Sequence, residues 1–311
     1  MYSILYYLGL LLVGYFGLTV VLYMLSLRSQ AAGFFARLLA AYASLVACAW
    51  FGVFASIFLR LFGDVHLAQW ATARAFKYTM RFTTGVTFRI DDPNDYLSRT
   101  RPAVIIGNHQ TELDVLALGW IFPKYCSVSA KKSLKNVPIL GWYMSLSGTV
   151  FIDRANSSSA RQAMAGASEE ITKNKQAVWM FPEGTRSYAK EPILLPFKKG
   201  AFHLAVQAGV PIIPVVIGNY SDVLYVQGRK FNAGEIPVKG KCSPARSILK
   251  PIETKNLTAA DVEDLTRDTR ELMLKELVNL TSRSRGRPMA MPAQNSGDGV
   301  IKASGAEATI S

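Results

Sequence analysis

The sequence predicts an α/β fold with a mostly parallel sheet and flanking helices, preceded by an N-terminal membrane hairpin of two hydrophobic helices. Three observations lead to this prediction. Two long uncharged runs open the chain, short apolar runs alternate with helix-like segments through its middle, and polar motifs follow several of those runs. We expect a hairpin over 1–62, an α/β domain over 63–280 and a disordered tail over 281–311.

The composition limits the classes of protein that this chain can belong to. It has 311 residues, half of them hydrophobic, and a net charge of +13. These values exclude a disordered chain and a small disulfide scaffold, and the positive charge suits an anionic partner. Cys48, Cys126 and Cys242 have no metal-ligand spacing, so we expect reduced thiols, no disulfide framework and no metal site.

The first two elements are apolar helices. No charged side chain occurs from Met1 to Leu27 or from Leu38 to Leu59, and a spanning helix needs about 20 apolar residues. A cleaved signal peptide is the alternative for the first run, but it would begin with a positive segment and be shorter. Two buried helices of a globular core are the alternative for both, although uncharged runs of this length are unusual there.

Charges around the hairpin bear on its orientation. The segment that follows is basic, which favours a cytosolic position for the α/β domain; its cations are Arg60, Arg74, Lys77, Arg81 and Arg89. Arg28 and Arg37 lie in the connecting loop and oppose a lumenal loop. A hairpin that crosses the bilayer and one that dips into a single leaflet both stay open.

The middle of the chain alternates between strands and helices. The expected strands are 103–107, 126–130, 149–152, 177–181, 212–217 and 245–249, and the expected helices between them are 112–121, 158–173 and 201–208. A last amphipathic helix is expected over 259–280. Beyond it Arg283, Arg285 and Arg287 either contact anionic lipid or belong to a solvated linker.

His109 is the first candidate for chemistry. It follows the AVIIG strand in the segment NHQTELD (108–114), and an imidazole at a strand end is suited to act as a general base near neutral pH. Asp114 lies one helical turn further on and would fix the tautomer of the ring. No Ser or Cys neighbours the pair, so a substrate hydroxyl would be the nucleophile.

Structural interpretations of these residues stay open beside the catalytic one. The segment from Thr111 to Asp114 also fits a capping box at the start of a helix. His109 would then be a loop residue that bonds only to the backbone. His203, on an apolar helix, is expected to be a packed structural histidine.

A second motif, FPEGTRS (181–187), follows the strand AVWMF. Gly184 would let the backbone approach a ligand closely, Arg186 offers a planar fork that matches phosphate oxygens, and Thr185 adds a hydroxyl. The motif therefore indicates a phosphate site. The alternative is an ordinary turn in which Glu183 pairs with Arg186 at the surface.

Cations recur at other strand ends and support an anionic ligand near His109. They are Lys131, Lys132, Arg154, Lys198 and Lys199. Nucleic acid is the rival anionic ligand, but the chain contains no helix-turn-helix, zinc-finger or RNP-like pattern, and it begins with membrane segments. We therefore expect no nucleic-acid partner.

Four segments in this order resemble the four motifs of the glycerolipid acyltransferase family. They are NHQTELD (108–114), GTVFIDR (148–154), FPEGTRS (181–187) and VPIIPVVI (210–217). The match with members that acylate lysophosphatidate is strengthened by two further segments, AKKSLKNVPILGW (130–142) and PFKKGAFHLA (196–205). The sequence of these motifs is similar to that of fungal members. The resemblance covers about residues 65–255.

This resemblance implies roles for particular residues. His109 would take the proton of an sn-2 hydroxyl, and Asp114 would orient it. Glu183, Gly184 and Arg186 would bind the glycerol phosphate, with Arg186 on the phosphate itself. Further contacts with the two substrates would come from Arg154 and Lys131 for the acceptor and from Pro214 for the acyl donor.

The implied reaction transfers a fatty acyl group from acyl-CoA to 1-acyl-sn-glycerol 3-phosphate, giving phosphatidic acid and CoA. Lysophosphatidic acid, acyl-CoA and the bilayer are the expected partners, and no bound cofactor is expected. The endoplasmic reticulum membrane is the expected location, with the lipid droplet as its alternative. Rival functions are acylation of glycerol 3-phosphate or another lysophospholipid, hydrolysis of acyl-CoA, and non-enzymatic membrane shaping.

Overall fold

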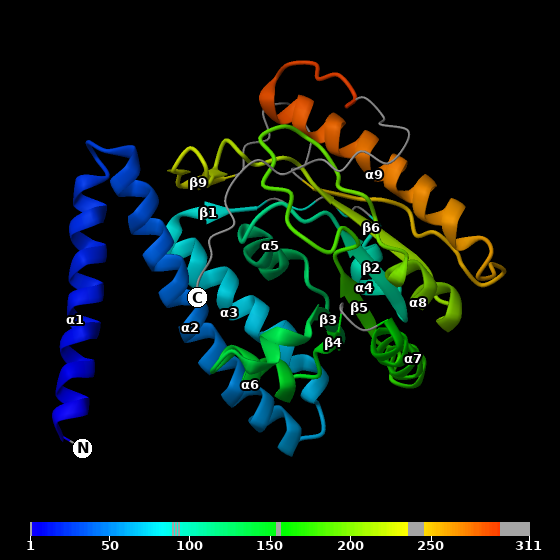
Figure 1. Ribbon diagram of the computed structural model, residues 1–311, viewed down its shortest axis with the longest axis horizontal. Coiled ribbons are helices and arrows are strands. Elements are labelled where there is room, and N and C mark those ends of the chain that lie inside the picture. Colours follow the sequence, from blue (N-terminus) through cyan, green and yellow to red (C-terminus); the bar gives the residue numbers. More distant parts are fainter. Residues whose placement is uncertain are drawn as a thin grey trace.

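The computed structural model describes residues 2–292 except positions 89, 91, 93, 154–156 and 236–245. A six-stranded sheet lies at its centre, helices cover both faces of this sheet, and a helical hairpin stands at one side (Figure 1). Five of the strands run parallel to one another. The prediction of an α/β fold with a mostly parallel sheet and flanking helices is therefore confirmed.

The sheet is built from the six apolar runs that were expected to form strands. They are β2 (Ala103–Gly107), β3 (Cys126–Lys131), β4 (Val150–Ile152), β5 (Ala177–Met180), β6 (Ile212–Ile217) and β10 (Arg246–Ile248). The order is β10-β6-β2-β5-β3-β4, and only β10 runs antiparallel to its neighbour. Ile106 of β2 faces Met180 of β5 on one side and Pro214 of β6 on the other. The carboxyl ends of these three strands therefore lie side by side.

Helices and short elements connect the strands. The helices are α3 (Ala68–Thr84), α4 (Tyr96–Arg99), α5 (Leu113–Ile121), α6 (Leu140–Leu146), α7 (Ser157–Lys173), α8 (Gly200–Ala208) and α9 (Val262–Arg285), with 3-10 turns η1 (Val65–Leu67) and η2 (Lys132–Asn136). Two small sheets pair β1 (Val86–Thr87) with β9 (Gly234–Glu235) and β7 (Leu224–Tyr225) with β8 (Lys230–Phe231).

Each face of the central sheet has its own apolar core, because successive side chains of a strand point to opposite faces. Val104 and Ile106 of β2 pack with residues of α7, α8 and α9. Ala103 and Ile105 pack on the other face with α5 and with Trp179 of β5. Every residue of β2 is buried, as expected for a central parallel strand covered on both sides. Such a strand is a rigid support for the loop that follows it.

The hairpin consists of α1 (Tyr2–Leu25) and α2 (Gln30–Leu61), and both helices are long and apolar enough to cross a membrane. The apolar span of α1 is 6% buried inside the protein and that of α2 is 33% buried. The Tyr15 hydroxyl donates to the Leu39 carbonyl (2.6 Å) and joins the two helices. The residues of α2 that pack on the α/β domain include a stripe of small ones at every fourth position, namely Ala40, Ser44, Cys48, Gly52 and Ser56.

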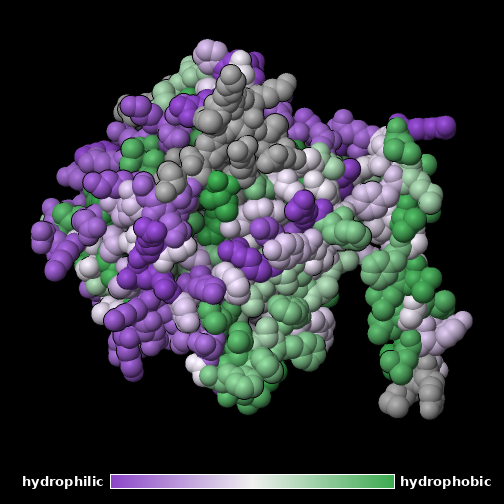
Figure 2. Space-filling model, turned by 180° about the vertical axis from the view of Figure 1, so that it is seen from behind, coloured by the Kyte–Doolittle hydropathy of each residue, from purple (hydrophilic) through white to green (hydrophobic). Residues whose placement is uncertain are grey.

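Apolar side chains gather on the free arm formed by α1 and on the lower end of the body (Figure 2). In Figure 1 the end of α2 and α6 occupy this lower end. Exposed aromatic residues there are Trp50, Phe54, Phe58, Phe62 and Trp142. An apolar surface that continues from the hairpin onto the α/β domain is typical of proteins that associate with membranes.

The last helix is longer than expected. It begins at Val262 and continues to Arg285, five residues past the predicted boundary at 280, because Leu280 and Thr281 are buried. Gly286 ends it in the left-handed conformation (φ 64°), which suits glycine. The remainder of the expected tail, 293–311, lies outside the described residues.

Candidate functional site

The carboxyl ends of β2, β5 and β6 bring three loops together. The His109 segment follows β2, the Glu183 segment follows β5, and the segment that contains Tyr220 follows β6. Asn108 locks the first loop to the third, because its side chain donates to the Ile217 carbonyl (2.9 Å) and accepts from the Ile217 amide (2.8 Å). Ligands of open parallel sheets bind at this edge, so the two sequence motifs share the place where chemistry is expected.

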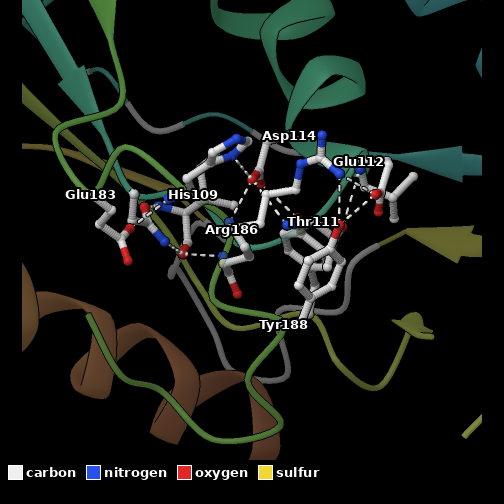
Figure 3. A network of polar contacts seen from close by, with 12 residues as sticks. His109, Thr111, Glu112, Asp114, Glu183, Arg186 and Tyr188 are labelled. Atoms are coloured by element: carbon white, nitrogen blue, oxygen red, sulfur yellow. Dashed lines mark hydrogen bonds and ion pairs between the residues drawn. The ribbon is translucent and has the colours of Figure 1, made fainter. Parts of the chain in front are cut away.

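His109 and Asp114 face one another (Figure 3). Nδ1 of His109 lies 2.8 Å from Oδ2 of Asp114, and the imidazole stacks on the Phe181 ring with a centroid distance of 4.2 Å. The His109 side chain keeps 18% of its surface exposed, whereas Asp114 is fully buried. In the described part of the chain Nε2 has no hydrogen-bond partner. An ionised Asp114 can only accept, so it places the ring proton on Nδ1 and leaves the Nε2 lone pair available.

Asp114 also serves the start of α5. Its Oδ2 accepts from the amides of Gln110 (2.6 Å) and Thr111 (3.1 Å), and the Leu113 amide donates to Oγ1 of Thr111 (3.1 Å). The capping interpretation and the orienting interpretation of Asp114 are therefore compatible. The same carboxylate binds the backbone amides that precede α5 and holds the imidazole.

Tyr220 completes this buried cluster and was missed by sequence reasoning. Its hydroxyl donates to Oδ1 of Asp114 (2.6 Å) and lies 3.0 Å from Oγ1 of Thr111. Burial and the nearby Asp114 carboxylate raise the pKa of Tyr220 well above its usual value, so the hydroxyl stays protonated. A tyrosine three residues after a parallel strand is the sequence signal, but its use depends on the knowledge that β6 neighbours β2.

Glu183 supports the backbone of the site. It is 3% exposed, and its Oε1 accepts from the His109 amide (2.7 Å) while Oε2 accepts from the Leu195 amide (2.8 Å). Burial raises the pKa of Glu183 to about 7, although these two N–H groups lower it in part. The resemblance implied a headgroup contact for Glu183, whereas its two oxygens are bound to backbone N–H groups.

Gly184 has a φ of 71°, which favours glycine. A Cβ there would lie 3.0 Å from Cε of Lys198, so that side chain covers the turn. The Lys198 amide donates to the Pro182 carbonyl (2.8 Å) and fixes the beginning of α8 to the FPEGTRS segment. One of the expected strand-end cations therefore stands beside the second motif.

Arg186 pairs with Glu112 and not with Glu183, so the alternative of a Glu183–Arg186 surface pair is wrong. Its Nη1 also donates to the Tyr188 hydroxyl (2.6 Å), which in turn donates to Oε1 of Glu112 (2.6 Å). Two backbone hydrogen bonds attach this segment to the first loop, from Ser187 N to His109 O (3.0 Å) and from Tyr188 N to Gln110 O (3.0 Å). The guanidinium therefore lies on the same edge as the imidazole, as Figure 3 shows.

The remaining candidates differ in exposure and position. Thr185 is exposed at the turn, Lys131 is exposed at the end of β3, and Pro214 is buried within β6, three residues before the strand ends. Arg154 lies outside the described residues. His203 is exposed on α8, so the expectation of a packed structural histidine is wrong; the apolar face of that helix turns Phe202 and Leu204 inward.

No group of three or more His, Cys, Asp or Glu side chains is placed to hold a metal ion within the residues that the structure describes. Cys126 is buried, and burial raises the pKa of its thiol. The described residues of this edge include two polar clusters, one of His109, Asp114 and Tyr220 and one of Arg186, Glu112 and Tyr188. This set can accept a proton and bind an anion.

The sequence of this chain is similar to those of known acyltransferases. The family model described as Acyltransferase matches residues 89–218. The chain is 44% identical to the 1-acyl-sn-glycerol-3-phosphate acyltransferase of Saccharomyces cerevisiae over 75% of this chain and 74% of that protein. It is 41% identical to the human 1-acyl-sn-glycerol-3-phosphate acyltransferase beta over 62% of this chain and 64% of that protein.

A solved structure has the same fold. The 1-acyl-sn-glycerophosphate acyltransferase PlsC of Thermotoga maritima superposes with a TM-score of 0.58 and 21% identity, covering 87% of this chain and 98% of that one. The fold and the sequence similarity thus define an acyltransferase of glycerolipids. The chain belongs to the 1-acyl-sn-glycerol-3-phosphate acyltransferase family and is an enzyme of that kind.

Proposed function

We propose that this enzyme transfers a fatty acyl group from acyl-CoA to the sn-2 hydroxyl of 1-acyl-sn-glycerol 3-phosphate, with His109 as general base and Asp114 as its orienting partner. The observation that carries this proposal is the 2.8 Å contact between Nδ1 of His109 and Oδ2 of Asp114. It leaves Nε2 free on a partly exposed ring at the sheet edge where ligands of this fold class bind.

In this mechanism Nε2 of His109 takes the proton of the acceptor hydroxyl while its oxygen attacks the thioester carbonyl. The new C–O bond forms a tetrahedral intermediate, and its collapse breaks the C–S bond. The protonated imidazole then neutralises the departing CoA thiolate, so the proton ends on CoA. Base catalysis of this kind contributes about 10²–10⁴-fold, and alignment of the two substrates in one complex supplies a further part.

Arg186 is the group that would hold the acceptor phosphate. Its guanidinium is planar and matches two phosphate oxygens at once, and the backbone bonds of Ser187 and Tyr188 hold its segment to the His109 loop. Lys198 beside Gly184, and the more distant Lys131, would add positive charge for the anionic groups of the two substrates. Arg154, Thr185 and Pro214 keep the expected substrate-binding roles as proposals.

The apolar hairpin would hold the enzyme in the bilayer, so that the acyl chains of both substrates stay in lipid while their headgroups reach the sheet edge. We place it in the endoplasmic reticulum membrane with the α/β domain on the cytosolic side, in line with the cations that follow the hairpin. Protease protection of a C-terminally tagged chain in sealed microsomes tests the orientation; a protected tag would contradict it.

Turnover of acyl-CoA and lysophosphatidate by purified wild type and His109→Ala tests the reaction. We expect His109→Ala to lower kcat by at least about 10²-fold with an unchanged thermal unfolding curve. His203→Ala, at an exposed position of α8, is the matched control and should keep full activity. Release of free fatty acid from acyl-CoA without an acceptor would favour a hydrolase instead. A preference for glycerol 3-phosphate would show that this compound, and not lysophosphatidate, is the acceptor. A fully active His109→Ala variant would exclude His109 as the general base.

A further inference from the structure

Glu112, Arg186 and Tyr188 form a closed set of polar contacts at the mouth of the site. Nη1 of Arg186 donates to Oε1 of Glu112 and to the Tyr188 hydroxyl (2.6 Å), and that hydroxyl donates to the same carboxylate oxygen (2.6 Å). Figure 3 shows the guanidinium turned toward Glu112. The side chains of Arg186 and Glu112 are 41% and 47% exposed, so an incoming anion can reach the pair from solvent.

The carboxylate of Glu112 has the chemistry of the ligand that Arg186 is proposed to bind. Carboxylate and phosphate oxygens both accept from a guanidinium fork. Nε and Nη2 of Arg186 have no hydrogen-bond partner among the described residues, while Nη1 is occupied by an internal anion. A substrate phosphate that binds end-on, through Nη1 and Nη2 together, must therefore replace Glu112 on Nη1.

The geometry allows such a replacement without movement of the backbone. Glu112 is the residue directly before α5, with helical dihedral angles (φ −61°, ψ −25°), so its main chain is fixed. Within the described chain the hydrogen bonds of its carboxylate are those with Arg186 and Tyr188. The side chain can thus rotate away from Arg186 while the neighbouring Asp114 stays bound to His109.

We propose that Glu112 is an exchangeable internal ligand of Arg186, which occupies the position of the acceptor phosphate in the empty enzyme and returns to it as the product leaves. The proposal rests on the proposed function of Arg186 as the phosphate-binding residue. Because substrate and product carry the same phosphate monoester, Glu112 weakens the binding of both by the same factor. A weaker product complex keeps the site open for the next acceptor.

The charge balance fits an exchange. A phosphate monoester carries about −1.5 to −2 charges near pH 7, more than the single charge of Glu112, so it displaces the carboxylate. An exposed ion pair is weak, so the exchange costs only a small part of the binding free energy. Removal of the Glu112 charge should therefore strengthen phosphate binding about three- to fivefold.

Glu112→Gln is the variant that tests the exchange, because glutamine keeps the shape of the side chain and the contact with Tyr188. We expect the KM for lysophosphatidate and the inhibition constant of phosphatidate to fall together by about three- to fivefold. Glycerol 3-phosphate, a soluble probe of the same headgroup, should become a stronger inhibitor by the same factor. The KM for acyl-CoA should not change.

Two further variants make the result decisive. Asp268→Asn removes a carboxylate from an exposed pair with Arg267 (2.9 Å) on α9 and should leave all these constants at their wild-type values. Arg186→Met should raise the KM for lysophosphatidate at least about tenfold. If it does so while Glu112→Gln raises the KM or leaves it unchanged, Glu112 only positions Arg186 and the exchange is refuted. If Arg186→Met leaves the KM unchanged, the phosphate role of Arg186 and the exchange both fail.

Discussion

The hydroxyl of Tyr220 donates a 2.6 Å hydrogen bond to Oδ1 of Asp114, the carboxylate whose other oxygen lies 2.8 Å from the His109 imidazole. His109 lies in the loop after β2, Asp114 in the first turn of α5 and Tyr220 in the loop after β6, and Tyr220 is 1% exposed. Each oxygen of Asp114 thus has a partner, which fixes the plane of the carboxylate and through it the plane of the imidazole. The Tyr220 hydroxyl is buried and bonded to Asp114 and Thr111, so we regard Tyr220 as a positioning residue.

Tyr220→Phe should therefore lower activity with little change in the fold. Phenylalanine keeps the ring but removes the donor to Asp114 and the partner of Thr111. We expect kcat to fall by at least about tenfold, since a hydrogen bond to a charged group contributes about 1.5–3 kcal/mol, while the KM for lysophosphatidate stays constant. Steady-state kinetics measure this split. A kcat within twofold of wild type would show that the ring only fills space.

The sheet could be predicted because each strand is encoded by a short apolar run that local sequence identifies. All five residues of β2 are apolar or glycine and all are buried, so the run itself indicates a covered central strand. The helix over 68–84 was not predicted. Its buried face includes Gln69, Thr72 and Thr84 beside Phe76 and Met80, and buried polar residues at helical spacing weaken the apolar pattern.

The candidate site was predictable only in part, because its contacts join separate loops. His109 and Asp114 lie five residues apart and could be paired from their spacing. The bonds of Tyr220 to Asp114 and of Glu183 to the His109 amide span 106 and 74 residues, and they follow from the order in which β6, β2 and β5 lie in the sheet. That order is a property of tertiary packing, which no local pattern encodes.

Glu183 gives the enzyme a pH-dependent stability. Burial raises the pKa of Glu183 to about 7 from 4.5, so the folded state binds a proton more tightly than the unfolded state. The stabilisation is fully present below about pH 4.5 and is lost as the pH rises through about 7. The rise of the pKa of Glu183 from 4.5 to about 7 corresponds to a change of roughly 3 kcal/mol in the free energy of unfolding.

Glu183→Gln should remove this dependence. Glutamine has one acceptor oxygen, so either the His109 amide or the Leu195 amide loses its partner, at a cost of about 1–3 kcal/mol at every pH. Urea unfolding of the detergent-solubilised protein at pH 5 and pH 8 measures both effects. We expect the difference between the two pH values to be smaller in Glu183→Gln than in wild type or in Glu263→Gln, a change at an exposed carboxylate of α9. Equal differences in the three proteins would contradict a raised pKa for Glu183.

Arg285 joins two loops of the site and is neither a lipid contact nor part of a solvated linker. Its side chain is 10% exposed at the end of α9. Nη2 donates to the Lys190 carbonyl (2.8 Å), on the segment after Tyr188, and to the side chains of Asn219 (3.0 Å) and Ser221 (2.9 Å), which flank Tyr220. The last turn of α9 thus ties the Arg186 loop to the Tyr220 loop.

Arg285→Met should loosen both loops together. The guanidinium loses bonds to the buried side chains of Asn219 and Ser221, whereas its carboxylate partners Glu191 and Asp222 are exposed. We therefore expect a loss of about 2 kcal/mol in the free energy of unfolding and a fall of about tenfold in kcat/KM for lysophosphatidate. Arg287→Met, two residues on and exposed, is the control and should match wild type in both measurements. Urea unfolding and initial rates on the same preparations provide the comparison. If Arg285→Met behaves as Arg287→Met does, the bonds of Arg285 do not hold the two loops in their active positions.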